Sequence, residues 1–135
     1  KYARASHDTG FLPREGNTTP RLIELLSLTR EEFTRRFQGS PVWRARYAGF
    51  LRNVCVALGN SRDLNAVQSL EKALTHEEPL VRGHAAWALG RLGAVEGLRR
   101  RMETETDLWV REEIQEALTC ESTVRTQGKW PVTSD

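Results

Sequence analysis

The stretch EPLVRGHAAWALGRL, residues 78–92, decides the fold of this chain. Its apolar residues recur at i, i+4, i+7, i+8 and i+11, namely at Val81, Ala85, Ala88, Leu89 and Leu92. That spacing places them along one side of an α-helix, which can bury this side against a neighbour. Strict alternation of apolar and polar residues is absent, so a β-strand is excluded. Gly93 stands where a left-handed cap would end the helix.

Two further copies of the pattern flank this stretch. Residues 107–118, DLWVREEIQEAL, align with it at an offset of 29, and residues 54–60, VCVALGN, align with residues 85–91 at an offset of 31. In the upstream copy we expect Gly59 to end a helix, as Gly93 does in the middle copy. Small residues in the middle copy would let a neighbouring helix approach closely.

Shorter amphipathic segments, residues 65–75 and 94–103, separate the copies. Two helices in about 30 residues, with Pro near a helix start and Val-Arg after it, resemble HEAT repeats. One such hairpin cannot bury its apolar stripe alone, so consecutive hairpins stack. The sequence therefore predicts an all-α fold, a short α-solenoid of HEAT-like repeats at residues 19–120 with an N-terminal helical cap.

Local signals define that cap. Thr19 and Pro20 open a first helix with Pro at its start. Thr29 and Glu32 form a capping box that opens a second helix, which we expect to stop at Gly39. Ser40 and Pro41 then begin a long helix that runs through Leu58, whereas residues 1–18 and 121–135 are predicted to be extended or flexible arms.

Composition excludes several classes of protein. The balance of 39% hydrophobic and 28% charged residues is that of an ordinary globular domain. No apolar run is long enough to span a bilayer, and the first twenty residues lack a signal peptide. The two cysteines, Cys55 and Cys120, are too isolated to hold a metal, and the three histidines do not cluster with carboxylates. We predict no metal site and no catalytic residues.

A basic strip with an interleaved aromatic residue points to RNA. His84, Trp87 and Arg91 recur at i, i+3 and i+7 on the side opposite the buried stripe. Phosphate contacts and base stacking need such cations and aromatic rings. Glu113 and Glu116 occupy the matching positions of the last copy, so the basic surface is expected to fade there. The candidate RNA-binding residues are Arg44, Arg52, Asn53, Asn60, Arg82, His84 and Arg91.

Structural alternatives stay open for two of these features. Trp87 fits either the core or a stacking surface. Arg82 and Arg111 repeat in phase, so pairing with the acidic end of an adjacent repeat is as consistent with the sequence as ligand binding is.

Four segments together resemble the carboxy-terminal region of epoxyqueuosine reductase. They are TPRLIELLSLTREEFTRRFQGSP (19–41), GSPVWRARYAGFLRNVCVALGN (39–60), EEPLVRGHAAWALGRLG (77–93) and VREEIQEAL (110–118). The resemblance implies a parent enzyme that reduces epoxyqueuosine to queuosine in tRNA with cobalamin and two [4Fe–4S] clusters. It also implies that residues 1–18 link to a missing iron–sulfur module, and that this chain itself holds no cofactor.

Two functions follow as hypotheses. The resemblance implies a cytoplasmic platform that binds the anticodon stem-loop of tRNA and positions it for the N-terminal catalytic module of the same parent chain. The alternative is a non-catalytic scaffold for protein interaction or for intramolecular support of that module, in which the basic residues pair internally.

Overall fold

The computed structural model describes residues 18–37 and 43–119, apart from the side chains of Phe37 and residues 43–45. Over these ranges the chain is helical and contains no strand, which confirms the all-α prediction. The elements are α2 (Thr19–Leu26), α3 (Arg30–Phe37), α4 (Trp43–Ser61), the 3-10 helix η2 (Leu64–Ala66), α5 (Val67–Ala73), α6 (Pro79–Leu92), α7 (Glu96–Met102) and α8 (Leu108–Thr119).

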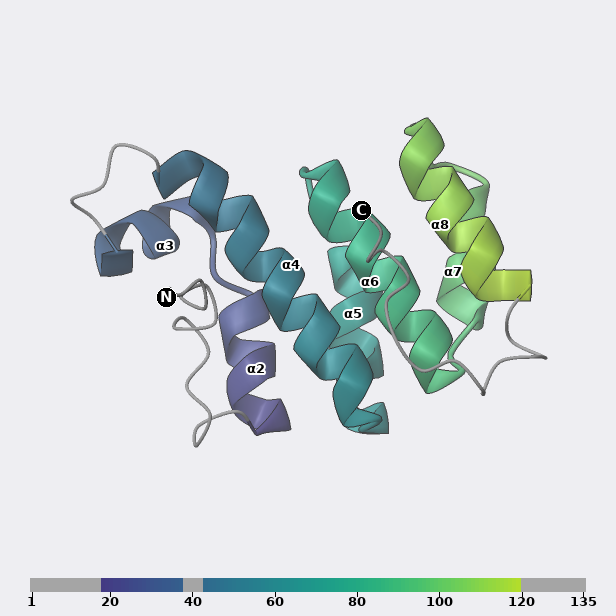
Figure 1. Cartoon of the computed structure of the whole chain (residues 1–135), viewed down its shortest axis with the longest axis horizontal. Helices are drawn as coiled ribbons and strands as arrows, with labels where there is room; N and C mark the ends of the chain where they lie inside the picture. The colour runs from purple at the N-terminus through teal and green to yellow at the C-terminus, as the bar shows by residue number, and fades with distance from the viewer. Residues whose placement is uncertain (1–17, 38–42, 120–135) are drawn as a thin grey trace, which may run out of the picture.

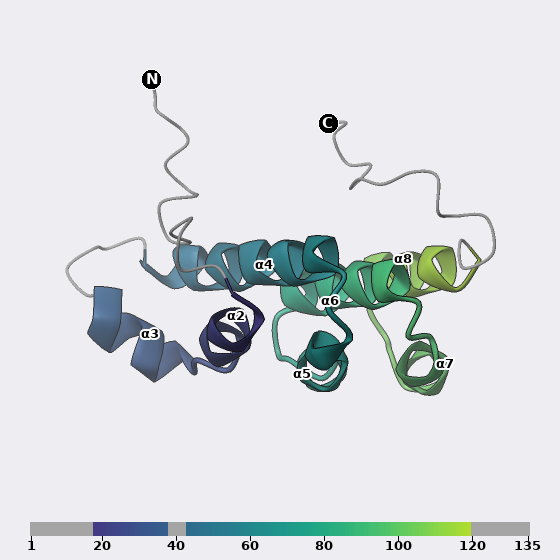
Figure 2. The ribbon, with the colours of Figure 1, turned by 90° about the horizontal axis from the view of Figure 1, so that it is seen from below.

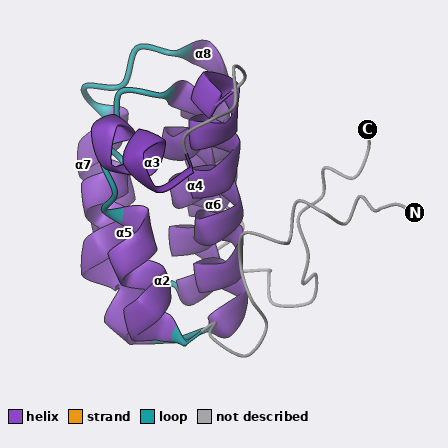
Figure 3. Ribbon diagram, turned by 90° about the vertical axis from the view of Figure 1, so that its left-hand side faces the viewer, coloured by secondary structure: helices purple, strands orange, loops and turns teal. Residues whose placement is uncertain are grey.

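The helices form two layers. α4, α6 and α8 lie side by side and run in the same direction, and α2, α5 and α7 form the second layer behind them (Figures 1 and 2). A view along the row shows the two layers edge-on (Figure 3). α4 packs against α6, and α6 packs against α8, while each also contacts a helix of the second layer. This is the predicted solenoid: α5–α6 and α7–α8 are hairpins, and α2 and α3 cover α4.

The core follows the apolar stripes of the three copies. Val81, Ala85 and Leu89 of α6 are fully buried, as are Val110 and Ile114 of α8. The cap contributes larger side chains, since Phe33 lies between Tyr47 and Phe50 with ring centroids 5.5 and 5.4 Å apart. Full burial of each large apolar side chain contributes about 1.5–3 kcal/mol. The buried residues of the cap and of the three copies belong to one cluster, so the core is continuous along the stack.

Gly59 does not end a helix, so that prediction was wrong. α4 continues to Ser61, and a Cβ atom at Gly59 would lie 3.0 Å from Ala88 Cα and 2.9 Å from Trp87 Cζ3 of α6. The glycine allows two backbones to approach closely. Gly90 has the same role between α6 and α8, since a Cβ atom there would lie 2.8 Å from Ala117 Cβ of α8. By contrast Gly93 does cap α6, with φ 76°.

The predicted cap signals lie mostly where the helices begin. The Glu32 amide donates to Thr29 Oγ1 (3.1 Å) and the Thr29 amide donates to Glu32 Oε1 (2.8 Å), which confirms the capping box. Pro20 stands in the first turn of α2, whose N-cap is Thr18. The predictions for Gly39, Ser40 and Pro41, and for the arms 1–17 and 120–135, fall outside the described residues. None of the described helices has the length and apolar character needed to cross a membrane.

Candidate nucleic-acid interface

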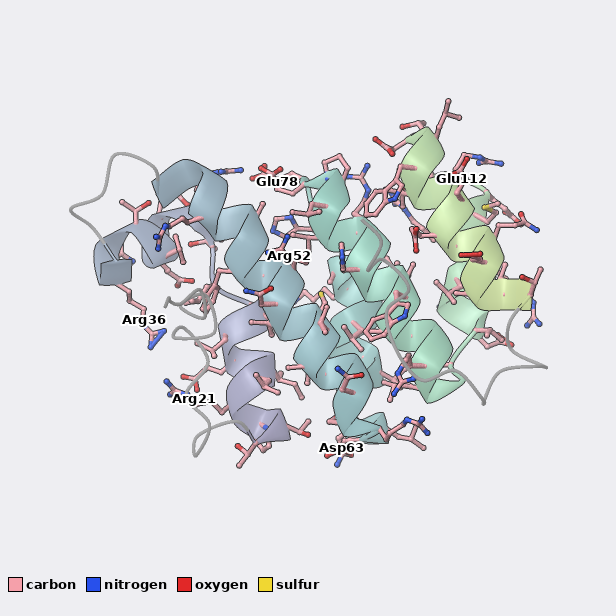
Figure 4. The ribbon with its side chains drawn as sticks, viewed as in Figure 1. Arg21, Arg36, Arg52, Asp63, Glu78 and Glu112 are labelled. Carbon is pink, nitrogen blue, oxygen red and sulfur yellow. The ribbon has the colours of Figure 1, made fainter. Side chains whose placement is uncertain are left out.

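The candidate interface is the side of the α4–α6–α8 layer that faces away from α2, α5 and α7, and we call it the outer face. Figure 4 looks onto this face and shows Arg52 near its centre. Helical phase and burial assign to it Arg52, Asn53, Asn60, His84, Trp87, Arg91, Trp109 and Glu113. Three helices that are separated in the sequence thus contribute to one surface.

Arg52 and Asn53 of α4 form a local pair on the outer face. Arg52 Nε donates to Asn53 Oδ1 over 3.2 Å, and both side chains are half-buried. The pair orients the guanidinium while its terminal nitrogens remain the part that can meet a phosphate. Asn60, two turns further along α4, is exposed.

His84 is a buried, neutral imidazole rather than a surface cation. It is 6% exposed, and Nδ1 lies 2.9 Å from the Leu80 carbonyl oxygen, to which a protonated Nδ1 donates. Burial lowers the pKa of His84, and the nearby charge of Arg52 lowers it further. The structure therefore places this candidate beside Trp109 of the next helix rather than free on the surface.

Trp109 of α8 also lies on the outer face, and the sequence-based prediction did not include it. Its indole lies beside His84 with ring centroids 5.7 Å apart, and it is 36% exposed. A Cβ atom at Gly83 would lie 2.3 Å from Trp109 Cζ3, so the indole lies across the α6 backbone at a glycine. One signal could have revealed it: Leu108 and Trp109 stand outside the buried stripe of the last copy.

Trp87 is an inter-helix packing residue. It is half-buried against the core and its ring lies over Gly59 of α4. The guanidinium of Arg91 lies on the same indole, 5.5 Å from the ring centroid, in a cation–π contact. Of the two roles that the sequence left open for Trp87, the structure supports packing between helices. Trp109 is the more exposed aromatic ring of the outer face.

Arg82 is held inside the protein. Its Nε and Nη2 donate to Glu105 Oε1 and Oε2, both over 2.9 Å, and its Nη1 donates to the carbonyl oxygens of His76 and Glu77. Arg111 repeats part of this pattern one repeat later, since its Nη1 donates to the carbonyl oxygens of Met102 and Glu105. These bonds show the structural role for the two in-phase arginines, and they leave Arg82 little capacity for a ligand.

The α8 side of the outer face is acidic. Glu113 is half-buried, and burial together with the charges of Glu116 and Glu112 raises its pKa to about 7. At neutral pH this carboxyl group is therefore only partly ionised. The basic character that Arg52 and Arg91 supply thus declines toward α8, whereas the side chain of Arg44 lies outside the described part.

The described residues offer no place for a cluster or metal. Across residues 18–37 and 43–119, no group of three His, Cys, Asp or Glu side chains could hold a metal ion. Cys55 is fully buried, and burial raises its pKa to about 12, so it remains a thiol. An iron–sulfur cluster needs several thiolates. The described part of the chain therefore does not fit the cluster that the resemblance implies for the parent.

Comparisons with known proteins agree with the fold and the resemblance. The family of HEAT repeats matches residues 46–119. Curated relatives named epoxyqueuosine reductase include proteins of Pseudomonas aeruginosa, 37% identical over 69% of this chain, and of Escherichia coli, 33% identical over 66%. The chain spans about a quarter of the length of these relatives (26% and 24%).

Solved structures give the same result. A crystal structure of epoxyqueuosine reductase with an epoxyqueuosine-modified tRNA-Tyr stem loop is 31% identical, with a TM-score of 0.65, over 73% of this chain and 27% of that protein. A structure of selenomethionine-labelled epoxyqueuosine reductase matches with a TM-score of 0.66 at 30% identity, over 75% of this chain and 28% of that protein. The resemblance in sequence is thereby confirmed in three dimensions.

Proposed function

This chain belongs to the HEAT-repeat family, and on that premise we propose that it is a tRNA-binding platform whose outer face receives an anticodon stem-loop. Its similarity to epoxyqueuosine reductase, one structure of which contains a tRNA stem loop, supports RNA as the ligand. The platform acts in the cytoplasm, and cobalamin and two iron–sulfur clusters belong to a catalytic module outside the described residues.

The observation that carries the proposal is the row Arg52, His84 and Trp109, which crosses three neighbouring helices on one surface. Arg52 supplies a guanidinium whose fixed fork suits phosphate oxygens. Trp109 supplies a partly exposed indole on which a base can stack. His84 lies beside Trp109 as a neutral ring. Cation and aromatic ring in one row match the chemistry of a single-stranded loop.

A second candidate function rests on the internal ion pairs. Arg30 of α3 pairs with Glu77 and Glu78 before α6, and Arg82 pairs with Glu105 before α8. Arginines used in this way hold the cap and the repeats in register. If the outer-face arginines served only the protein, the chain would be a scaffold that supports another module.

Binding measured against salt separates the two functions. An RNA hairpin with the shape of an anticodon stem-loop should bind the chain with log K falling linearly against log salt, by roughly 0.7–0.9 for each phosphate contacted. Arg52→Gln should weaken binding and lower the slope by about one contact. Arg99→Gln is the matched control, because Arg99 is exposed on α7 in the other layer. Absence of binding at low salt would leave only the scaffold.

A further inference from the structure

Gly83 of α6 makes room for a side chain of the next helix. A Cβ atom at this buried glycine would overlap Cζ3 and Cη2 of the Trp109 indole and lie 3.1 Å from its Cε3. At Gly59 and Gly90, by contrast, the close atoms include Cα and Cβ of an alanine in the neighbouring helix. Glycine is less favourable than alanine inside a helix. The indole that lies on Gly83 is therefore the reason for a glycine at this position.

The stacking of the repeats does not itself require this glycine and this indole. The offset of 31 relates Gly83 of α6 to Arg52 of α4, and the offset of 29 relates Trp109 of α8 to Leu80 of α6. α4 packs against α6, and α6 against α8, yet only the second contact has a glycine and a tryptophan at the matching positions. Two neighbouring helices of this fold thus pack together with or without the pair.

His84 supports the same indole from the next residue of α6. The two ring centroids lie 5.7 Å apart, with an angle of 48° between the ring planes. The imidazole is itself anchored, since its Nδ1 lies 2.9 Å from the Leu80 carbonyl oxygen, one turn earlier in α6. A ring that is 6% exposed has little room to turn away in a close-packed interior. Gly83 and His84 thus fix the side of the indole that faces α6.

The rest of the indole is open to a ligand. Trp109 is 36% exposed although it packs on Gly83 and His84. Leu108, the residue before it, is 76% exposed but projects about 100° away around α8, because successive residues of a helix are separated by that angle. The two side chains therefore do not form the broad apolar patch that a protein partner needs. A single aromatic ring, held on one side and accessible on the other, suits a nucleobase.

We propose that the Trp109 indole stacks on one unpaired base of the RNA, and that Gly83 and His84 are the positioning residues that hold the ring for it. The inference rests on the proposed function and adds to it the kind of nucleotide bound and the residues that present the ring. Because α6 covers one side of the indole, a base stacks on the other side only. A base within a duplex is already stacked on both sides, so the site takes a loop nucleotide.

The test removes one base at a time from the RNA. A hairpin with the shape of an anticodon stem-loop, and copies that each carry one abasic nucleotide in the loop, are bound to the full 135-residue chain and to Trp109→Leu. Leucine keeps an apolar contact with α6 but has no ring on which a base stacks. Loss of the base at one position should weaken binding to wild type about tenfold and leave Trp109→Leu unchanged, because that contact is already absent. The salt slope of Trp109→Leu should equal that of wild type, since an uncharged ring releases no counterion.

Variants of α6 test the positioning roles. Gly83→Ala displaces the indole while the ring itself remains, so the effect of the same abasic position should fall from about tenfold to below about twofold. His84→Leu removes the bond to the Leu80 carbonyl oxygen and should reduce the effect at the same position. Gly90→Ala is the matched control, because its added methyl group strains the contact with Ala117 of α8 and not the indole. It should lower the melting temperature yet keep the tenfold effect, and circular dichroism checks that each variant is folded.

The possible results are distinct. Abasic effects that are equal in wild type and Trp109→Leu at every loop position overturn the base site, leave the proposed function standing and assign the indole to a protein partner. An effect that is lost in Trp109→Leu but kept in both Gly83→Ala and His84→Leu, or lost equally in Gly90→Ala, overturns the positioning roles. A wild-type chain that binds no hairpin at low salt overturns the proposed function and the base site together.

Discussion

The Arg82 guanidinium holds the Glu105 carboxylate in a two-point pair, Nε to Oε1 and Nη2 to Oε2, each over 2.9 Å. The Glu105 side chain is fully buried, and Arg101 and the Asp107 amide donate to it as well. Burial opposes its ionisation, but these hydrogen bonds outweigh burial, so the pKa of Glu105 lies below its usual range. The pair fixes the start of α6 to the loop before α8, and hence the register of two repeats.

Replacing Arg82 should therefore destabilise the fold. Arg82→Met leaves a buried carboxylate with weaker compensation, and we expect a loss of about 3 kcal/mol in the free energy of unfolding, measured by urea titration. Arg82→Met combined with Glu105→Gln should recover part of this loss because no charge is then buried. A loss below about 0.5 kcal/mol for the single variant would show that the pair does not hold the repeats together.

Two glycines of α4 should respond in opposite directions to alanine. Gly59→Ala places a Cβ atom 3.0 Å from the Ala88 backbone, so the helices must separate, and stability should fall by about 1–3 kcal/mol. Gly49→Ala is the control in the same helix, where the nearest atom is Arg52 Nη2 at 3.6 Å. That change should stabilise by about 0.5–1 kcal/mol through helix propensity. Thermal unfolding of both variants checks the pair, and equal effects would contradict the close approach.

Two tryptophans on the outer face should separate stability from binding. Trp87→Ala removes packing against Gly59 and should cost about 3 kcal/mol of stability. Trp109→Ala should cost less stability, about 1–2 kcal/mol, because the ring is 36% exposed, while RNA affinity falls by about 1–3 kcal/mol. Denaturant unfolding and hairpin binding of the same two variants test this division, which the reverse pattern would refute.

Glu113 should make stability depend on pH. Its pKa is about 7 in the folded chain, above the ordinary value of 4.5 for a glutamate, so the folded state binds its proton more tightly than the unfolded state does. Stability from this group is present below about pH 4.5 and is lost as the pH rises to about 7. Glu113→Gln keeps the neutral form, so its free energy of unfolding should exceed that of wild type by roughly 1 kcal/mol at pH 8 and by little at pH 4. The gain at pH 8 is modest because the half-buried side chain remains partly in contact with water.

The control for that series is Glu24→Gln, which removes an exposed carboxylate from α2. This variant shows what the loss of one exposed carboxylate does, without any change at the half-buried Glu113. A Glu113→Gln curve parallel to wild type over the same range would mean that the carboxyl group is well solvated.

Helical periodicity made the repeats predictable, because an apolar stripe such as Val81, Ala85 and Leu89 is stable in water only when another helix covers it. α6 begins at Pro79 and ends before Gly93, as the local signals indicate. The role of Gly59 was not predictable in the same way. A sequence does not distinguish a glycine that ends a helix from one that allows a neighbouring helix to approach. In the structure, the closeness of Ala88 to Gly59 shows the second role.

The candidate site was harder to predict for a related reason. Helical phase identifies Arg52 and Arg91 as outward residues, but it does not show which residue of the next helix lies beside them. Trp109 of α8 lies beside His84 of α6, and Glu105 pairs with Arg82 from the loop before α8, 23 residues further along the chain. Such lateral partners depend on the spacing between helices, which a periodicity within one helix does not contain.

The common direction of α4, α6 and α8 has an electrical consequence (Figure 1). Each helix carries about half a positive charge at its start and half a negative charge at its end, and parallel helices add these at two opposite edges. Glu77 and Glu78 precede α6 and Asp107 caps α8, whereas Arg62 and Arg91 stand where α4 and α6 end. These charged side chains thus oppose the helix dipoles at both edges, and Arg30 offsets part of the charge of Glu77 and Glu78. The potential that a polyanion meets at the outer face is therefore set by side chains such as Arg52 rather than by the helix dipoles.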